Sequence, residues 1–314
     1  MQRSQTPAVV REPVDREDVP PGTVRTGLIG AGIGPSFSPA LHEREAHALG
    51  LPLRYRRWDT DRLGAEPGDV GELLGAARTR GYAGLNITHP CKQLVLGHLD
   101  RLSPDAAAIG AVNTVVIGED GGLTGHNTDW TGFRDGLADG LAGTAPGRVV
   151  LLGAGGAGAA AGYALARCGV RELDVVDIDP ARAAALAASL RPHAGAGTRI
   201  DGHARTALAG LLPRADGLVH ATPVGMAEHP GLPCDAGLLA DLPWVAEIVY
   251  RPLDTALLRA AREAGCRTVD GGRMAVHQAA EAFRLFTGRT PDPDRMLAHL
   301  AELIATEQED GRVA

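Results

Sequence analysis

The sequence of 314 residues lacks the features that define several classes of protein. It contains no run of about 18 uninterrupted apolar residues, which argues against a membrane-spanning helix. It has no long basic run and its formal net charge is -7, so we expect neither a nucleic-acid nor an anionic-membrane partner. Aromatic residues make up only 4% of the chain, whereas glycine is abundant at 42 residues. Small residues in that proportion suit the tight packing of strands against helices in α/β folds.

Cysteine is scarce, and its spacing excludes two common kinds of site. The four cysteines, Cys91, Cys168, Cys234 and Cys266, form no C-x-x-C pair, and the eleven histidines show no spacing typical of metal ligands. The sequence therefore predicts neither a disulfide framework nor a metal site, and a reducing cytoplasm is the expected location. Residues 1–23 are polar, charged and rich in proline, without the apolar core of a signal peptide, and we expect a disordered tail there.

From residue 24 onwards, short apolar segments alternate with helical patterns. Strands are expected at residues 24–30, 53–60, 81–88 and 111–117, and helices at residues 38–50 and 68–80 and from Pro90. Strands that alternate with helices indicate a largely parallel sheet covered on both faces, so the sequence predicts an α/β fold. A second α/β unit follows, and we place the domain boundary near residue 128.

The most specific local signal is a glycine-rich segment of the second unit. An apolar strand at residues 149–152 leads into Gly153, Gly155 and Gly158, which match G-x-G-x-x-G, and an Ala-rich helix follows. Asp177 ends the next strand about 20 residues later, as in a dinucleotide-binding fingerprint. These glycines would let the backbone approach a pyrophosphate at the helix N-terminus. The alternative is a glycine-rich turn used only for packing.

Asp177 also bears on which dinucleotide is bound. A carboxylate at this position can accept hydrogen bonds from the adenosine ribose, but it would repel a 2′-phosphate. No arginine follows it directly, because the next residues are Ile178 and Asp179. The sequence therefore favours NAD over NADP, although Arg182, one turn into the next helix, could still reach a phosphate.

Lys92 is the candidate acid/base. With Pro90 at the first helical position and His89 as N-cap, Lys92 would be the third residue of a helix, where the dipole disfavours a cation by about 0.3–1 kcal/mol. That position would help the ammonium to lose its proton, whereas a nearby carboxylate, for which Asp129 is the candidate, would oppose this. The alternatives are a solvated surface lysine and, for Asp129, the N-cap of a helix beginning at Trp130.

Small hydrogen-bonding residues cluster near the predicted strand ends of the first domain. They are Ser36, Ser38, Asn86, Thr88 and Asn113. An open α/β sheet binds its ligand at the carboxyl ends of its strands, so these side chains suit a small polyhydroxylated acid. Ser38 could instead be a plain N-cap, since Pro39 follows it.

Eight motifs occur in an order that resembles the shikimate/quinate dehydrogenase family. They are SFSPALH, GLNITHPCK, GAVNT, GHNTD, LLGAGGAG, ATPVGM, VYRPLDTALLRAA and DGGRMAVHQAAEAF, and the likeness covers roughly residues 24 to 290. It implies an N-terminal, mostly parallel α/β substrate domain (24–128 with 271–314) and a Rossmann dinucleotide-binding domain (129–270). The C-terminal helices would return to the first domain and deliver Gln278 to the substrate.

The resemblance also implies roles for individual residues. Lys92 would be the acid/base and would work as a pair with Asp129. The substrate pocket would comprise Ser36, Ser38, Asn86, Thr88, Asn113, Asp129, Tyr250 and Gln278. The cofactor cleft would comprise Gly153, Ala154, Gly155, Gly156, Ala157, Gly158, Asp177, Arg182, Ala221, Thr222, Pro223, Ile248 and Gly271. A homodimer is a further implication.

Departures from the family pattern sharpen the expected function. Most NADP-using members carry an Asn-Arg-Thr type run where this chain has Asp177, Ile178 and Asp179, which is similar to the NAD-dependent quinate/shikimate dehydrogenases of actinobacterial type. Ser38 stands where quinate-active relatives often have Thr, so quinate and shikimate stay unranked. We therefore expect an NAD-dependent dehydrogenase that interconverts quinate and 3-dehydroquinate, shikimate and 3-dehydroshikimate, or both. The alternatives are an aminoquinate or aminoshikimate dehydrogenase of an antibiotic pathway and a non-catalytic NAD-binding regulator.

Overall fold

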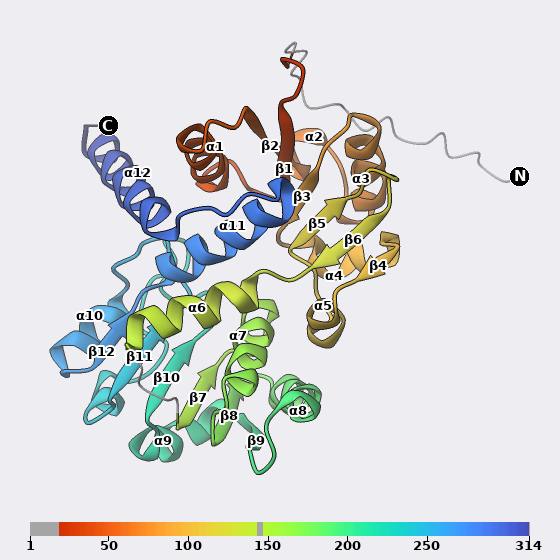
Figure 1. The fold of residues 1–314 in the computed structure, drawn as a ribbon. Helices are drawn as coiled ribbons and strands as arrows, with labels where there is room; N and C mark the ends of the chain where they lie inside the picture. The colour runs from red at the N-terminus through yellow and green to blue at the C-terminus, as the bar shows by residue number, and fades with distance from the viewer. Residues whose placement is uncertain (1–18, 143–146, 314) are drawn as a thin grey trace, which may run out of the picture. The chain divides into compact units, whose positions relative to one another are not determined.

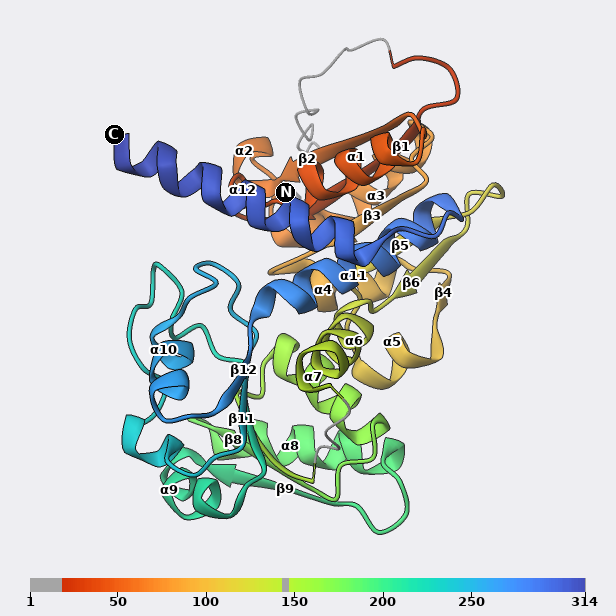
Figure 2. The same ribbon diagram turned by 60° about the vertical axis from the view of Figure 1, so that its left-hand side comes forward.

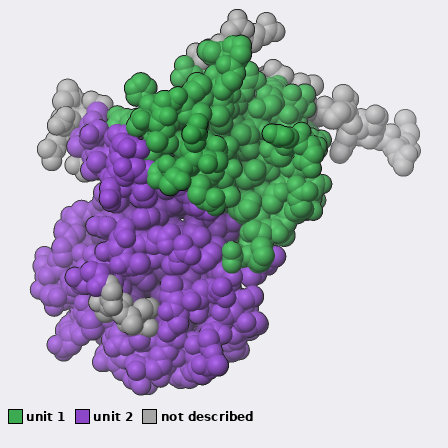
Figure 3. Space-filling view, in the orientation of Figure 1, with its two compact units in different colours: residues 1–106, 110–126, 282–291 green, residues 107–109, 127–281, 292–314 purple. Residues whose placement is uncertain are grey.

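The computed structural model describes residues 19–142 and 147–313, with side chains up to residue 307. Residues 1–18 of the predicted tail lie outside the described residues. The chain divides into two compact units, which Figure 3 colours separately. Unit 1 comprises residues 1–106, 110–126 and 282–291, and unit 2 comprises residues 107–109, 127–281 and 292–314. Compact packing does not define which residues bind a ligand, so the domain assignment made from the sequence stays a prediction.

Unit 1 is built on a six-stranded sheet in the order β2-β1-β3-β5-β6-β4 (Figure 1). The strands are β1 (Val24–Gly30), β2 (Leu53–Asp59), β3 (Gly84–Ile87), β4 (Arg101–Leu102), β5 (Thr114–Ile117) and β6 (Leu123–His126). The pairs of β1 with β2 and β3 are parallel, whereas β5 runs antiparallel to both β3 and β6. The turn at residues 118–122 explains the last pair, since a connection this short can join only antiparallel strands.

Helices cover both faces of this sheet. They are α1 (Ser38–Ala48), α2 (Thr60–Leu63), α3 (Val70–Thr79), α4 (Cys91–Leu94) and α5 (Pro104–Ile109), with single 3₁₀ turns at Pro67–Asp69 and Val95–His98. Successive residues of β1 point to opposite faces, and both faces are buried: Ile29 packs with α3, and Leu28 packs with α1 and Phe283. The predicted sheet covered on both sides is therefore confirmed in this unit.

Unit 2 contains a six-stranded sheet that is parallel throughout, in the order β12-β11-β10-β7-β8-β9. The strands are β7 (Arg148–Leu152), β8 (Glu172–Asp177), β9 (Arg199–Ala204), β10 (Gly217–His220), β11 (Trp244–Glu247) and β12 (Arg267–Val269). The helices are α6 (Asp129–Leu141), α7 (Gly156–Arg167), α8 (Pro180–Leu190), α9 (Leu208–Leu211), α10 (Ala256–Glu263), α11 (Gly271–Thr287) and α12 (Pro293–Val313). Single 3₁₀ turns lie at Arg191–His193, Arg205–Ala207, Leu212–Arg214 and Ala236–Leu239.

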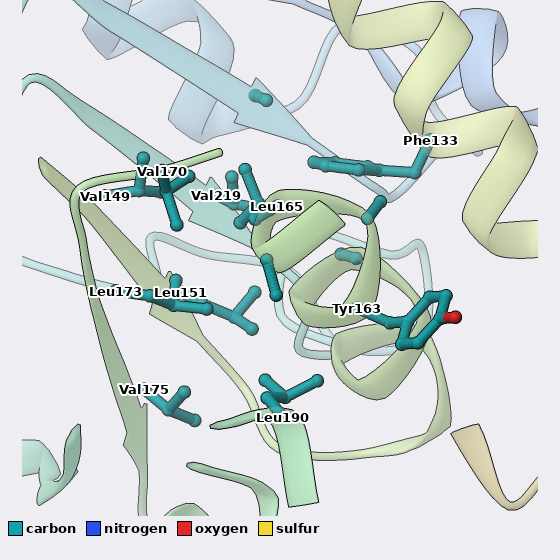
Figure 4. Packing of buried hydrophobic residues seen from close by; sticks show 14 of the residues in the cluster. Phe133, Val149, Leu151, Tyr163, Leu165, Val170, Leu173, Val175, Leu190 and Val219 are labelled. Atoms are coloured by element: carbon teal, nitrogen blue, oxygen red, sulfur yellow. The ribbon is translucent and has the colours of Figure 1, made fainter. Parts of the chain in front are cut away.

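The core of unit 2 is likewise double-sided. Figure 4 shows Leu151 of β7 and Val175 of β8 facing α7, which contributes Leu165, and Phe133 of α6 belongs to the same cluster. The next residue of each strand faces the other way, so Val150 packs in a second cluster with residues of α9 and α10. Both helices are labelled in Figure 2. This architecture confirms the predicted α/β class.

Each sheet has a point at which the strand order reverses. In unit 1, β1 lies between β2 and β3, so the loops that follow β1 and β3 diverge at their carboxyl ends. In unit 2, β7 lies between β8 and β10 in the same way. Open α/β sheets bind ligands at such points. The loops that follow β1, β3, β7 and β10 are therefore the places to look for a site.

The predicted start of the helix near Lys92 is wrong by one residue, and Ser38 does not have the N-cap role considered as an alternative for it. The helix near Lys92 begins at Cys91 with Pro90 as N-cap, because the Cys91 N–H donates to Thr88 O at 2.8 Å and closes a turn first. Its four residues make a dipole argument for Lys92 weak. The N-cap of α1 is Phe37, so Ser38 lies inside the helix rather than capping it.

The start of α6 also differs from the sequence prediction. The helix begins at Asp129 rather than at Trp130, and its N-cap is Thr128. The capping oxygen comes from Asn127, whose Oδ1 accepts from the N–H groups of Asp129 and Trp130 at 3.1 and 3.3 Å. The alternative role of Asp129 as an N-cap is therefore wrong. Within residues 19–142 and 147–313, no helix is long and apolar enough to cross a membrane.

Candidate active site

A neutral hydrogen-bonded cluster surrounds Asn86, which lies near the carboxyl end of β3 in unit 1. The Tyr55 hydroxyl of β2 donates to Asn86 Oδ1 of β3 at 2.8 Å. Asn86 Nδ2 donates in turn to Thr114 Oγ1 of β5 at 3.0 Å and to the Asn113 carbonyl at 3.3 Å. The Thr114 hydroxyl donates to Asn113 Oδ1 at 3.1 Å. All four residues are buried. The sheet therefore joins Asn86 and Asn113, two predicted substrate residues.

The partners of Asn86 define what it can offer a ligand. An amide has two N–H donors and an oxygen with two lone pairs. Both donors of Asn86 are used within the protein, and Tyr55 uses one lone pair of Oδ1. Asn86 is thus left with one acceptor position, which suits a hydroxyl group that donates its proton.

The other predicted residues of unit 1 lie on the loops at the same edge of the sheet. Ser36 Oγ lies 3.2 Å from Ser38 Oγ and accepts from the Ser38 N–H at the same distance. Thr88 directly follows β3, and Lys92 is the second residue of α4. The Lys92 carbonyl accepts from the Val112 N–H at 2.9 Å, which ties α4 to the segment before Asn113 and Thr114.

Lys92 has a chemical distinction that sequence reasoning missed. Of the 31 lysine and arginine residues of the chain, it is the only lysine. Arginine stays protonated in proteins, whereas lysine can lose its proton and act as a base. Among the basic side chains with a long aliphatic stem, only Lys92 can therefore exchange a proton with a substrate.

In unit 2, the start of α6 collects three more predicted residues. Asp129 is 8% exposed at the first helical position. Burial raises the pKa of the Tyr250 phenol, the negative charge of Asp129 acts in the same direction, and Arg251 opposes it. The Thr128 hydroxyl donates to Gln278 Oε1 at 3.5 Å, and a Cβ on Gly132 would lie 2.7 Å from Gln278 Cβ. The close approach of α6 and α11 therefore needs glycine at position 132.

The glycines of the loop after β7 divide into two groups. A Cβ on Gly153, which has φ +112°, would lie 2.6 Å from Ala221 O, and one on Gly158 would lie 2.0 Å from Gly153 O. Packing alone explains these two. A Cβ on Gly156 meets nothing within 4 Å, and one on Gly155 meets only Arg182 Nη2 at 3.6 Å. A Cβ at these two positions would thus have room beside the N-terminus of α7, where a pyrophosphate is predicted to bind.

Asp177 supports this loop from the end of β8. It is 6% exposed, and its Oδ2 accepts from the Ala154 N–H at 2.7 Å while Oδ1 accepts from the Asp179 N–H at 3.0 Å. Its carboxylate is thus held at the edge of the predicted cofactor loop. The neighbouring Ile178 is 77% exposed, and the Arg182 side chain reaches Gly155.

The remaining predicted cofactor residues follow β10 and β11. Ala221, Thr222 and Pro223 come directly after β10, and the Ile248 N–H donates to the carbonyl of His220, the last residue of β10, at 3.0 Å. A Cβ on Gly271 would lie 2.4 Å from Ile248 O, so α11 approaches this segment closely. Ala157 lies in the first turn of α7.

Beside these loops is a cavity of about 390 Å³, lined in part by Met226, Tyr250, Leu253 and Ile304. Across residues 19–142 and 147–313, no group of three or more His, Cys, Asp or Glu residues is placed to hold a metal ion.

Sequence reasoning missed Tyr55, His220 and Glu247. The last two end buried parallel strands, and their side chains are 0% exposed and hydrogen-bonded to each other. A polar residue at the end of an otherwise apolar strand was the available signal. Tyr55 gave no such signal, because a tyrosine in an alternating strand also fits a packing role.

Two family models match the chain. The shikimate dehydrogenase substrate binding domain matches residues 28–115, and the shikimate 5′-dehydrogenase C-terminal domain matches residues 272–300. A shikimate dehydrogenase (NADP(+)) of Streptomyces avermitilis is 60% identical over 284 residues, which cover 89% of this chain and 96% of the relative. A quinate/shikimate dehydrogenase (NAD(+)) of Corynebacterium efficiens is 50% identical over 281 residues, which cover 90% and 99%.

A solved structure agrees with these relatives. The quinate dehydrogenase of Corynebacterium glutamicum in complex with NAD is 46% identical, with a TM-score of 0.83 and coverage of 89% of this chain and 99% of that chain. Identity at this level over nearly the full length of several relatives shows common family membership. The chain therefore belongs to the shikimate dehydrogenase family of oxidoreductases that act on a secondary alcohol.

Proposed function

We propose that this protein is an NAD-dependent dehydrogenase that interconverts quinate with 3-dehydroquinate, shikimate with 3-dehydroshikimate, or both. The observation that carries the proposal is the similarity, at 50% and 60% identity, to relatives named for these two reactions. We further propose residues 24–128 with 271–314 as the substrate domain, 129–270 as the cofactor domain, a cytoplasmic location and a homodimer.

The substrate residues are those that can exchange hydrogen bonds with ring hydroxyls and a carboxylate. Asn86 accepts from one hydroxyl, since its amide protons are already used. Ser36 and Ser38, whose hydroxyls lie within hydrogen-bond distance of each other, receive a second polar group of the substrate. Thr88, Asn113, Tyr250 and Gln278 complete the proposed set. Such a set fits a small polyhydroxylated cyclohexane carboxylate.

Lys92 is the proposed acid/base. In oxidation, the neutral amine takes the proton of the reacting hydroxyl, and in reduction the ammonium returns it. Bound NAD would supply the nicotinamide that accepts the hydride. The Asp129 carboxylate orients the reacting hydroxyl and, as the proposed partner of Lys92, favours the protonated lysine. The presence of both residues also disfavours the non-catalytic regulator, which would need neither.

The preference for NAD over NADP is supported by Asp177 and Ile178. A buried carboxylate with fixed backbone partners repels a 2′-phosphate, and Ile178 offers no positive charge to bind one. Arg182 reaches the same loop and is the residue through which NADP could still bind. The names of the relatives divide between the two cofactors, so the choice needs a direct measurement.

The test is a substrate panel with both cofactors. Quinate, shikimate and their amino analogues are each mixed with the protein and NAD or NADP, and absorbance is followed at 340 nm. We expect reduction of NAD with quinate or shikimate, and kcat/KM for NADP at least about tenfold lower, which equals about 1.4 kcal/mol. Turnover of the amino analogues alone would move the assignment to the antibiotic-pathway enzymes. NAD binding without turnover of any cyclohexane acid would favour the regulator.

A further inference from the structure

A fully buried histidine–glutamate pair joins two neighbouring strands behind the predicted cofactor loops. His220 ends β10 and Glu247 ends β11, and they are direct partners in the parallel register. His220 Nδ1 lies 2.8 Å from Glu247 Oε1, and both side chains are 0% exposed. Neither residue has a role among the predicted substrate, cofactor or catalytic residues. Burial of two ionisable groups is costly unless their partners are well placed, so the position needs an explanation.

Glu247 is anchored by donors from three directions. Its Oε1 accepts from the Val249 N–H at 3.0 Å as well as facing His220, and its Oε2 accepts from the Thr255 hydroxyl at 3.1 Å. Thr255 caps α10, because its Oγ1 accepts from the Leu258 N–H at 3.2 Å. A carboxylate so placed only accepts hydrogen bonds, and therefore His220 Nδ1 carries a proton and donates it.

The other ring nitrogen of His220 faces the loop after β10. His220 Nε2 lies 2.5 Å from Thr222 Oγ1, which also accepts from the Val224 N–H at 3.3 Å. In either protonation state of Nε2, this contact fixes the direction of the Thr222 hydroxyl. The loop then turns back at Gly225, which has φ +99°, so that a Cβ there would lie 3.6 Å from Thr255. Residues 221–226 are thus folded over the buried pair.

We propose that His220 is a positioning residue for the dehydrogenase. Glu247 holds the Nδ1 side of the ring, and the Nε2 side holds Thr222, so that the loop of residues 221–226 keeps the shape that the cofactor meets. The inference rests on the proposed function, because the resemblance assigns Ala221, Thr222 and Pro223 to the cofactor. It predicts that substitutions of His220 change KM for NAD but not KM for the substrate.

Two substitutions of similar size separate the two sides of the ring. The amide nitrogen of asparagine can take the place of Nδ1 but does not reach the place of Nε2, whereas glutamine reaches the place of Nε2. His220→Asn therefore keeps a donor for Glu247 and loses Thr222, and His220→Gln does the reverse. We expect His220→Asn to raise KM for NAD about tenfold while KM for quinate or shikimate stays within about twofold. His220→Gln should keep KM for NAD within about threefold of the wild-type value, and it should lower the melting temperature more than His220→Asn does.

A double-mutant cycle tests whether His220 acts through Thr222. Thr222→Val keeps the shape of the side chain and removes the hydroxyl, and it should raise KM for NAD about as much as His220→Asn. KM for NAD in the double variant should be no higher than in either single variant, because both substitutions remove the same contact. A KM for NAD about 100-fold above the wild-type value, as expected if the two free-energy changes were additive, would overturn the proposal. A folded His220→Asn protein with wild-type KM for NAD would overturn it equally.

Failure of the proposed function can be recognised separately. If the wild-type protein turns over no cyclohexane acid, the same variants are compared by titrating NADH and following its fluorescence. A tenfold weaker NADH affinity in His220→Asn and in Thr222→Val, without further loss in the double variant, would support the positioning role. Equal affinities for the wild-type protein and both variants would overturn it.

Discussion

Both units hold a buried polar cluster near the carboxyl end of one central strand, β3 in unit 1 and β10 in unit 2, but the clusters differ in charge. In unit 1, Tyr55, Asn86 and Thr114 form a neutral network across three strands. In unit 2, the network is built around the carboxylate of Glu247, with His220 as its neighbour. The same position in two α/β sheets therefore carries two kinds of chemistry.

The difference shows how the acceptors are used. One lone pair of Asn86 Oδ1 is not used by any hydrogen bond described above, so this oxygen can accept a hydrogen bond from a ligand hydroxyl. The Glu247 oxygens accept hydrogen bonds from His220 of β10, from the Val249 N–H after β11 and from the Thr255 hydroxyl at the start of α10. Hydrogen bonds to a charged group contribute about 1.5–3 kcal/mol each, more than the 0.5–1.5 kcal/mol of neutral ones. The charged cluster thus suits holding loops in place, and the neutral one suits recognition.

The largest effect is expected at Lys92, which belongs to neither cluster. Lys92→Ala should bind NAD normally and lose about 10²–10⁴ in kcat, because general acid–base catalysis is worth about that much. Lys92→Arg is the matched control, since it keeps the charge but cannot give up a proton at working pH. Single-turnover rates and NADH titrations measure the two properties. Retention of more than about a tenth of kcat by either variant would contradict the acid/base role.

The second-largest effect is expected at Asp177 and tests whether a carboxylate of unit 2 affects NAD binding without affecting substrate binding. In Asp177→Asn, one of the backbone N–H groups of Ala154 and Asp179 would meet an amide nitrogen instead of an oxygen. We expect KM for NAD to rise about tenfold, equal to about 1.4 kcal/mol, with KM for the substrate unchanged. Asp179→Asn is the control, because its exposed side chain only caps α8 through the Ala181 N–H. An equal rise in the substrate KM would remove the distinction between the units.

A smaller effect is expected from the neutral cluster. Tyr55→Phe removes the donor that orients the Asn86 amide. The substrate KM should rise about threefold to tenfold, as the loss of one neutral hydrogen bond allows, and KM for NAD should stay constant. Tyr82→Phe is the control, since Tyr82 packs edge-on against Trp58 in the same unit at 5.4 Å between ring centroids. Identical kinetics for Tyr55→Phe and the control would mean that the hydrogen bond from Tyr55 is not needed to orient Asn86 for the substrate.

The sequence allowed the fold class, the family and the glycine-rich loop to be predicted. These depend on local patterns: the alternation of strands and helices, and glycines at fixed spacing. Helix starts were less predictable, because the turn that ends at Cys91 and the cap from Asn127 override the rule based on Pro90 and Asp129. Asn86 and Asn113 were predicted as site residues, but the contact of Asn86 with Tyr55 and the pair of His220 with Glu247 could not be predicted, since only the arrangement of the strands brings these residues together.

The smallest effect on turnover, and a separate effect on stability, is expected at His42 behind the neutral cluster. Its ring centroid lies 4.7 Å from that of Tyr55, and neither ring nitrogen has a hydrogen-bond partner among the described residues. Burial lowers the pKa of His42 from 6.5 to about 3, so between these values the unfolded chain binds a proton that the folded chain does not. Stability is therefore lost as the pH falls through this window, by about 1.4 kcal/mol per pH unit, and is unaffected by His42 above it.

His42→Phe should remove that loss without a change in kcat at neutral pH. Urea unfolding at pH 7, 6 and 5 measures the difference in the free energy of unfolding between the variant and the wild-type protein. This difference should grow toward acid by about 1.4 kcal/mol per pH unit below pH 6.5. His47→Phe, on the exposed side of the same helix, should give a difference that hardly changes. If His42→Phe behaved like His47→Phe, His42 would be protonated in the folded protein, and the cluster of unit 1 would be next to a charge after all.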